Sequence, residues 1–358
     1  MIVSKIELKS FRNYHAASVA FDKKLNVITG ANGAGKTNIV EAIHYLSLAR
    51  SFRTNVDAEL IERGQDYASI DATIKEGDLV RQVKITLSHE GKKINCNGHR
   101  IDKLSELSDL INVIIFDPRD VMMFQDLPKA RRRFLDISLS KQTSVYLDYA
   151  SQYEKALKER NELLKDDHVN RLRLEAVTET LIDLAEPIIH YRVGYVAQIN
   201  DILGKIVKAI KGENDEIRMI YVPFVAPGDN FRKQAKEAYN KSLDGDLHRK
   251  VTGLGPHRED FSMTLNGDDI ATYGSQGENR LLVLALKLSP YFLIQNKDKR
   301  PIVVLDDVLS ELDTNHQDKL LKFLERFDQV FITATKYDKY GASVYEVADH
   351  QISRRKSL

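Results

Sequence analysis

The chain has 358 residues, with 53 Lys and Arg against 52 Asp and Glu, so its net charge is +1. A net charge near zero speaks neither for nor against DNA binding, but it means that any DNA-binding surface must be a local basic patch. The single cysteine, Cys96, excludes an intrachain disulfide framework, and no apolar run is long enough for a membrane-spanning helix. We therefore expect a cytoplasmic protein with enough aliphatic residues for two domains.

The N-terminal part alternates apolar and polar residues. Residues 2–8 and 82–87 have this period of two, which predicts half-exposed strands of an antiparallel subdomain.

The most specific motif lies between these strands. Residues 30–37 fit the pattern G-x-x-x-x-G-K-[ST], after a short apolar run at 25–29 and before a helical pattern at 38–46. Strand, glycine loop and helix together turn backbone N–H groups and a helix N-terminus toward phosphate. A glycine-rich turn with a chance lysine is the alternative. The motif predicts a nucleotide site formed by Gly30, Ala31, Asn32, Gly33, Ala34, Gly35, Lys36 and Thr37.

Helical spacing begins near Lys129 and continues in two seams, at 146–163 and 177–206. They predict a short antiparallel helical pair, with Pro187 kinking or splitting the second helix. We expect a mainly helical arm at 129–249, inserted into a head domain made of 1–128 and 250–358.

A basic run opens this helical region. Lys129, Arg131, Arg132 and Arg133 are the DNA-contact candidates of the sequence. A solvated helix face is an equal alternative, and coupling of the arm to bound nucleotide is another.

Two downstream segments supply further candidate residues for the nucleotide site. Ser275 precedes an apolar helical pattern at 281–288, which places it at or near a helix N-cap. Residues 301–305 predict a buried parallel strand that delivers Asp306 and Asp307 to its carboxyl end. We expect Asp306 to hold Mg²⁺ together with Thr37. Lys36 is expected to reach the β- and γ-phosphates, and Asp307 is expected to orient or deprotonate the attacking water. Acids at this position also cap helices, which is the alternative.

These motifs resemble the ATP-binding-cassette class of ATPases. Ser275, Gln276, Gly277 and Glu278 are similar to its S-G-G-Q signature, and residues 310–313 to its D-loop. The resemblance implies a head-to-tail homodimer with two ATP molecules in the interface, each covered by the partner's signature. It predicts an α/β fold, with a phosphate-loop ATPase head, an antiparallel β subdomain and an inserted helical domain.

Residues 6–14 resemble the opening of chromosome-maintenance and DNA repair ATPases, and residues 126–136 and 255–260 resemble the RecF family among them. The resemblance implies that Arg12 approaches the nucleotide. It also implies an ATP-gated DNA clamp, with slow DNA-dependent ATPase activity, that helps RecO and RecR load the RecA recombinase. A transport-energising ATPase subunit is the alternative. The chain departs from the class at two places. Its acidic pair is Asp-Asp where transporters have Asp-Glu, so the water-activating carboxylate is one methylene shorter. Thr335 stands in place of the usual switch histidine, which removes one γ-phosphate contact and fits slow hydrolysis. A glutamine equivalent to the Q-loop is not evident, and residues 116–119 occupy its place.

Overall fold

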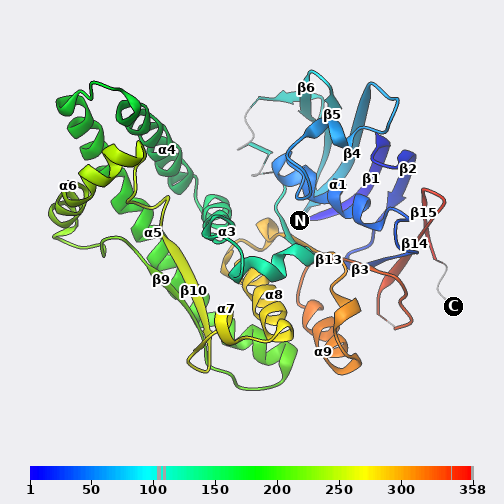
Figure 1. Cartoon of the computed structure of the whole chain (residues 1–358). Coiled ribbons are helices and arrows are strands. Elements are labelled where there is room, and N and C mark those ends of the chain that lie inside the picture. Colours follow the sequence, from blue (N-terminus) through cyan, green and yellow to red (C-terminus); the bar gives the residue numbers. More distant parts are fainter. Residues whose placement is uncertain (103–105, 108–109, 340, 356–358) are drawn as a thin grey trace. The chain divides into compact units, whose positions relative to one another are not determined.

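The computed structural model describes residues 1–102, 106–107, 110–339 and 341–355, which form two compact units (Figure 1). Unit 1 comprises Met1–Asp120, Ile206–Glu213 and Leu284–Leu358, and unit 2 comprises Val121–Lys205 and Asn214–Val283. These boundaries differ from the predicted ones, because residues 250–283 group with the helices of unit 2. The reason is pairing: the strand at Asp260–Leu265 joins the strand at Ile217–Val222.

The first sheet of unit 1 is antiparallel, in the order β2-β1-β4-β5-β6-β7. Alternate residues of its long strands are buried, so one face packs on the core and the other meets solvent, as the alternation predicted. Its strands are β1 Ile2–Phe11, β2 Tyr14–Ala20, β4 Tyr67–Glu76, β5 Leu79–Ser88, β6 Gly91–Cys96 and β7 His99–Ile101.

The second sheet of unit 1 is mixed, in the order β15-β14-β3-β13-β12-β8. Five neighbouring strands run parallel, and only β15 runs antiparallel to its neighbour. The central strands are buried at nearly every residue because both faces are covered. The strands are β3 Lys24–Thr29, β8 Val113–Phe116, β12 Ile302–Leu305, β13 Gln329–Ala334, β14 Ser343–Ala348 and β15 Gln351–Arg354.

Helix α1 (Lys36–Leu48) lies in the core of unit 1. Every residue from Ile39 to Ser47 is buried, and one apolar cluster joins α1 to residues of both sheets. A helix buried all round suits a site that must be rigid. The remaining elements of unit 1 are η1 Asp57–Leu60, η3 Lys297–Lys299, η4 Leu309–Glu311 and α9 Thr314–Leu324.

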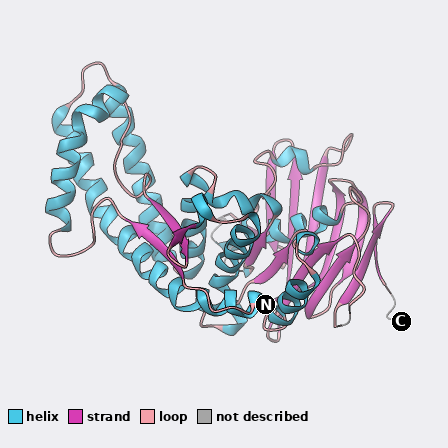
Figure 2. Ribbon diagram, turned by 60° about the horizontal axis from the view of Figure 1, so that its bottom comes forward, coloured by secondary structure: helices cyan, strands magenta, loops and turns pink. Residues whose placement is uncertain are grey.

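Unit 2 is mainly helical, with a three-stranded sheet in the order β11-β10-β9 (Figure 2). Pro187 does not split its longest helix, which runs unbroken from Arg171 to Lys211 and reaches unit 1. Helix α6 was not anticipated from the sequence. The elements are α3 Pro128–Gln142, α4 Ser144–Lys165, α5 Arg171–Lys211, β9 Ile217–Val222, α6 Phe231–Arg249, β10 Asp260–Leu265, β11 Asp268–Asp269 and α7 Ile270–Tyr273.

Three elements cross the boundary between the units: α5, η2 (Pro118–Phe124) and α8 (Gln276–Leu293). Among the helices of the described chain, we find none with both the length and the apolar character that crossing a membrane requires.

Candidate nucleotide-binding site

The phosphate loop connects the end of β3 to the start of α1, as the motif predicted. Its shape requires glycine at two positions. A Cβ on Gly30 would lie 2.5 Å from the carbonyl oxygen of Val347, and one on Gly35 would lie 2.7 Å from Nδ2 of Asn13. Both glycines also have positive φ values, of 150° and 116°.

Side chains from the β1–β2 turn brace the loop from behind. The Tyr14 hydroxyl donates to the carbonyl of Gly35 over 3.1 Å, and Nδ2 of Asn13 donates to the carbonyl of Ala34 over 3.1 Å. Burial raises the pKa of Tyr14, so its hydroxyl remains a donor at neutral pH. Asn38 in turn donates to Oδ1 of Asn13 over 2.7 Å. The loop is therefore held in shape by the protein itself.

Lys36 lies across this loop. Its Nζ donates to the carbonyls of Gly30 and Ala31, over 2.7 and 2.9 Å. Burial lowers the pKa of Lys36, while the charges of Asp307 and Asp306 raise it. The ammonium thus sits at the loop with two acids nearby, where the sequence placed it.

The two acids follow β12, and the structure brings them to the phosphate loop. Asp306 Oδ1 accepts hydrogen bonds from the hydroxyls of Thr37, at 3.1 Å, and Thr333, at 2.6 Å. Burial raises the pKa of Asp306, and these two hydrogen bonds oppose the rise. Thr37 and Asp306, the two residues predicted to hold Mg²⁺, therefore contact each other directly.

Asp307 has a left-handed backbone with φ of 51°, and its N–H donates to Thr333 Oγ1 over 2.9 Å. Thr333, at the end of the neighbouring strand β13, therefore fixes both acids at once. Sequence reasoning missed Thr333. The signal was a hydroxyl residue near the carboxyl end of a buried strand.

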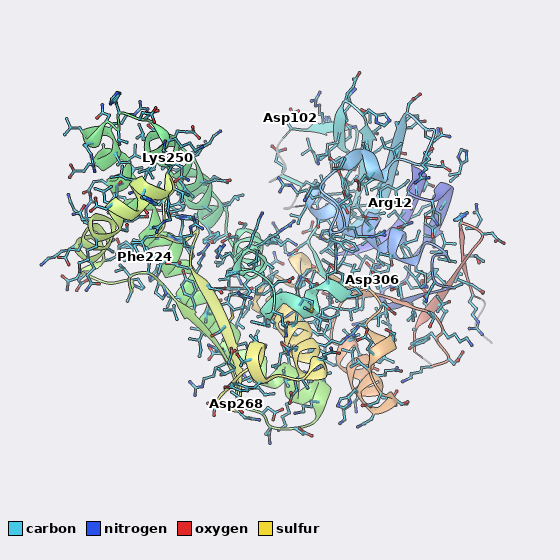
Figure 3. All side chains as sticks on the ribbon, in the orientation of Figure 1. Arg12, Asp102, Phe224, Lys250, Asp268 and Asp306 are labelled. Atoms are coloured by element: carbon cyan, nitrogen blue, oxygen red, sulfur yellow. The ribbon has the colours of Figure 1, made fainter. Side chains whose placement is uncertain are left out.

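Arg12 lies in the turn after β1, and Figure 3 labels it together with Asp306 in unit 1. Its guanidinium forms a bidentate pair with Glu41 of α1, over 2.9 and 2.7 Å. Arg12 also lines a pocket of about 840 Å³ that shares Asn13 and Asn38 with the surroundings of the phosphate loop. The lining residues are Arg12, Asn13, Asn38, Arg53, Ala58, Glu59, Ile61, Glu62, Arg63, Gly64, Gln65 and His89.

The predicted Q-loop position follows β8. Asp117 there is buried, and its Oδ1 accepts from both the N–H and Nε of Arg119, each over 2.9 Å. The charge of Asp117 also contributes to the raised pKa of Asp306. The residue that directly follows β8 is therefore an aspartate paired with arginine.

The signature segment lies in unit 2 and starts α8. The N–H and hydroxyl of Ser275 donate to Oε2 of Glu278, over 2.9 and 2.8 Å, and the Glu278 N–H donates back to Ser275 Oγ over 3.2 Å. This is a reciprocal capping box, so Ser275 is the helix N-cap that the sequence indicated. Gln276 and Gly277 occupy the two positions between them.

The basic run on α3 divides into two kinds of residue. Arg131 is buried and forms a bidentate pair with Asp260, with both distances 2.8 Å, and Arg132 donates to the carbonyl of Glu259 over 2.8 Å. These contacts argue against Arg131 as a DNA contact, because its guanidinium is used inside unit 2. Lys129 and Arg133 are exposed and remain candidates.

The segment 255–260 packs inside unit 2. Nδ1 of His257 lies 2.9 Å from the Tyr153 hydroxyl, and its Nε2 lies 3.1 Å from the carbonyl of Thr252. Burial lowers the pKa of His257 to about 4, so the ring is neutral at pH 7. This segment has a structural role within the unit.

Comparisons with known proteins agree with this site. The family described as RecF/RecN/SMC N terminal domain matches residues 2–352. The "DNA replication and repair protein RecF" of Bacillus velezensis is 37% identical over 350 residues, covering 94% of each chain. The protein of the same name from Clostridium acetobutylicum is 35% identical over 363 residues, covering 99% of each.

Solved structures give the same result. A structure described as the recombination mediator protein RecF with ATP, in the RecFOR pathway, aligns with a TM-score of 0.90 and 32% identity. The alignment covers 99% of this chain and 97% of that one. An Smc head domain from Pyrococcus furiosus aligns with a TM-score of 0.61 at 18% identity, which shows a shared fold. The chain therefore belongs to the RecF family of DNA replication and repair proteins, within the wider group of SMC-type ATPase heads.

Proposed function

We propose that this protein is an ATP-dependent DNA clamp of recombinational repair, which closes as a homodimer on ATP and opens on slow hydrolysis. The observation that carries the proposal is the hydrogen-bonded contact of Thr37 with Asp306, at the mouth of a preformed phosphate loop. Phosphate-loop NTPases hold Mg²⁺ with this pair of groups.

The residues present fit ATP and Mg²⁺. The loop is already in its cradle shape, Lys36 is its cation, and Oδ2 of Asp306 accepts no hydrogen bond from a described residue. Mg²⁺ would supply charge neutralisation at the β- and γ-phosphates. The pocket beside the loop is polar, with volume and amide groups suited to the nucleoside half of ATP.

Each step of the reaction uses residues of this chain. Lys36 would neutralise charge on the transferred phosphoryl group, and Asp307 would orient or deprotonate the attacking water. Ser275 and its helix N-terminus would contact the γ-phosphate held by the partner chain, which makes the dimer a condition for turnover. To do so, Ser275 must exchange its bonds with Glu278 for bonds to phosphate.

Closure of the dimer would create a basic surface that binds DNA through phosphates, independently of sequence. Lys129 and Arg133 are its candidate contacts in unit 2, since both are exposed. The matched RecF structures are described as belonging to the RecFOR pathway. By this relationship we propose RecO and RecR as partners and loading of RecA as the outcome.

A gel-shift with short gapped duplex DNA tests the proposal. We expect retention of the DNA with ATP and Mg²⁺, little retention without nucleotide, and none beyond that level with Lys36→Ala. Retention that is equal in all three conditions would exclude an ATP-gated clamp.

A further inference from the structure

Glu41 is a fully buried carboxylate on the phosphate-loop helix. Its side chain has 0% exposure and lies one helical turn after Thr37. Burial of an isolated carboxylate costs several kcal/mol, so its neighbours must compensate. They are three donors: the two guanidinium groups of Arg12 and Arg53, and the hydroxyl of Ser51 at 2.5 Å.

The contacts to the two arginines are unequal. Arg12 uses Nε and Nη2 on the two oxygens of Glu41, and its Nη1 donates to the carbonyl of Glu59 over 2.9 Å. A bidentate pair fixes the plane of a guanidinium as well as its position. Arg53 makes a single longer bond to Glu41, of 3.3 Å, and one of 2.7 Å to Oδ1 of Asn38.

Both arginines face the pocket beside the phosphate loop. They line it together with Asn13 and Asn38, the residues that also brace the loop. Among the described residues, Nε and Nη2 of Arg53 have no hydrogen-bond acceptor, and its side chain is 41% exposed. The carboxylate of Glu41 faces two guanidiniums, so this cluster of three residues carries a net positive charge, although Glu59, Glu62 and Arg63 also line the pocket.

We propose that Glu41 is a positioning residue for nucleotide binding. Its carboxylate holds the guanidinium of Arg12, and by a second contact that of Arg53, against the wall of the pocket. Because Glu41 and Thr37 lie on the same helix, the two arginines are also held at a fixed distance from Thr37. Two long cationic side chains are thereby ordered before the triphosphate arrives, which lowers the entropy cost of binding it. The inference depends on the proposed ATP-binding function and adds a residue to it.

A purely structural role for Glu41 makes a different prediction. The chain holds a second buried ion pair for comparison, Arg160 with Asp246, whose side chains are 1% and 0% exposed. Asp246→Asn disrupts that pair within unit 2 and is a matched control. Both variants should lower the unfolding temperature, since each leaves a cation without its anion. Only Glu41→Gln should change the affinity for ATP.

The test is a double-mutant cycle on the full-length protein with Mg²⁺-ATP as the probe. We expect Glu41→Gln to raise the dissociation constant and KM for ATP about tenfold, with kcat changed less than about twofold. In an Arg12→Ala background the same substitution should have little further effect, because the group that it positions is gone. Glu41→Asp keeps the charge and should restore part of the affinity. It also serves as the test variant if Glu41→Gln does not fold.

Three results would overturn the inference. They are an ATP affinity within about twofold of wild type in Glu41→Gln and Glu41→Asp, an equal loss with and without Arg12, or the same loss in Asp246→Asn. Lys36→Ala in the same assay separates this failure from a larger one. If Lys36→Ala binds ATP normally, the proposed function itself fails; if only Lys36→Ala loses binding, the inference about Glu41 alone is wrong.

Discussion

The hydroxyl of Thr37 lies 3.1 Å from Oδ1 of Asp306, although 269 residues separate them in the chain. The contact forms because β13 pairs in parallel with both β3 and β12, so that the carboxyl ends of these strands meet at one edge. Helix α1 starts at that edge, and strand β12 ends there, directly before Asp306 and Asp307.

Lys36→Ala should abolish ATP binding, because the ammonium that bonds to the loop carbonyls is the cation available to the β- and γ-phosphates. Lys36→Arg should bind ATP and hydrolyse it slowly, since a planar guanidinium keeps the charge but not the point-like contact. Equilibrium binding and phosphate release measure the two effects. Wild-type turnover by Lys36→Ala would contradict the assignment of the phosphate loop.

Thr333→Val should weaken Mg²⁺ binding at Asp306 and change the pH dependence of the ATPase activity. Burial raises the pKa of Asp306, and the 2.6 Å hydrogen bond from Thr333 opposes that rise by favouring the charged form. Protons compete with the metal for this carboxylate, so ATPase activity is lost as pH falls through the raised pKa. Removing the hydroxyl should move this acidic limb upward by about one pH unit at limiting Mg²⁺. Thr333→Ser, which keeps the hydroxyl, is the control, and an unmoved limb in Thr333→Val would refute the coupling.

Asp307→Asn should bind ATP, hydrolyse it poorly and accumulate as a dimer. Asparagine tolerates the left-handed backbone at this position, where φ is 51°, so the fold and the bond to Thr333 should persist. The lost carboxylate removes the group that orients or activates water. Analytical ultracentrifugation with saturating ATP is the measurement. A variant that stays monomeric would speak against the sandwich dimer.

Ser275→Arg should keep ATP binding but lose ATP-dependent dimerisation and DNA binding together. A bulky cation at the N-cap of α8 breaks the capping box with Glu278, at about 1 kcal/mol, and blocks approach of the partner's γ-phosphate. Ser275→Thr retains the hydroxyl and is the matched control.

Mixing Ser275→Arg with Lys36→Ala chains tests the in-trans arrangement. One interface site of such a heterodimer carries both defects and the other carries neither, so partial recovery of ATPase activity is expected. Full activity and normal dimerisation by Ser275→Arg alone would reduce residues 275–278 to a helix start.

Arg131→Ala should destabilise unit 2 instead of weakening DNA contact directly. It removes the bidentate pair with Asp260 and a 2.6 Å bond to the carbonyl of Met123, at a cost of roughly 2 to 4 kcal/mol. Arg133→Ala, at an exposed position on the same helix, should cost less than about 0.5 kcal/mol but reduce the salt slope of DNA binding by about 1. Urea unfolding and DNA titrations at several salt concentrations compare the two. Equal effects on stability would contradict this division.

Much of this protein was determined by its sequence alone. The phosphate loop, its flanking strand and helix, the buried strand ending at Asp306 and the N-cap at Ser275 are local patterns, set by φ restrictions, periodicity and capping, and the structure has them all. The RecF resemblance came from the same local motifs and is confirmed by the family match. That match favours the DNA repair ATPase over the transporter alternative.

Tertiary structure decided what local patterns cannot encode. Residues 250–283 join the helical unit because β10 pairs with β9, and strand pairing depends on partners far apart in the chain. Arg131 and Arg133 look alike in sequence, but only packing buries one against Asp260 and leaves the other in solvent. Thr333 contacts Asp306 only because the folded chain brings their two strands together. Glu41 likewise acquires Arg12 and Arg53 as partners only in the folded chain. The chemistry of a single residue is local, whereas its burial and its partners depend on how the whole chain packs.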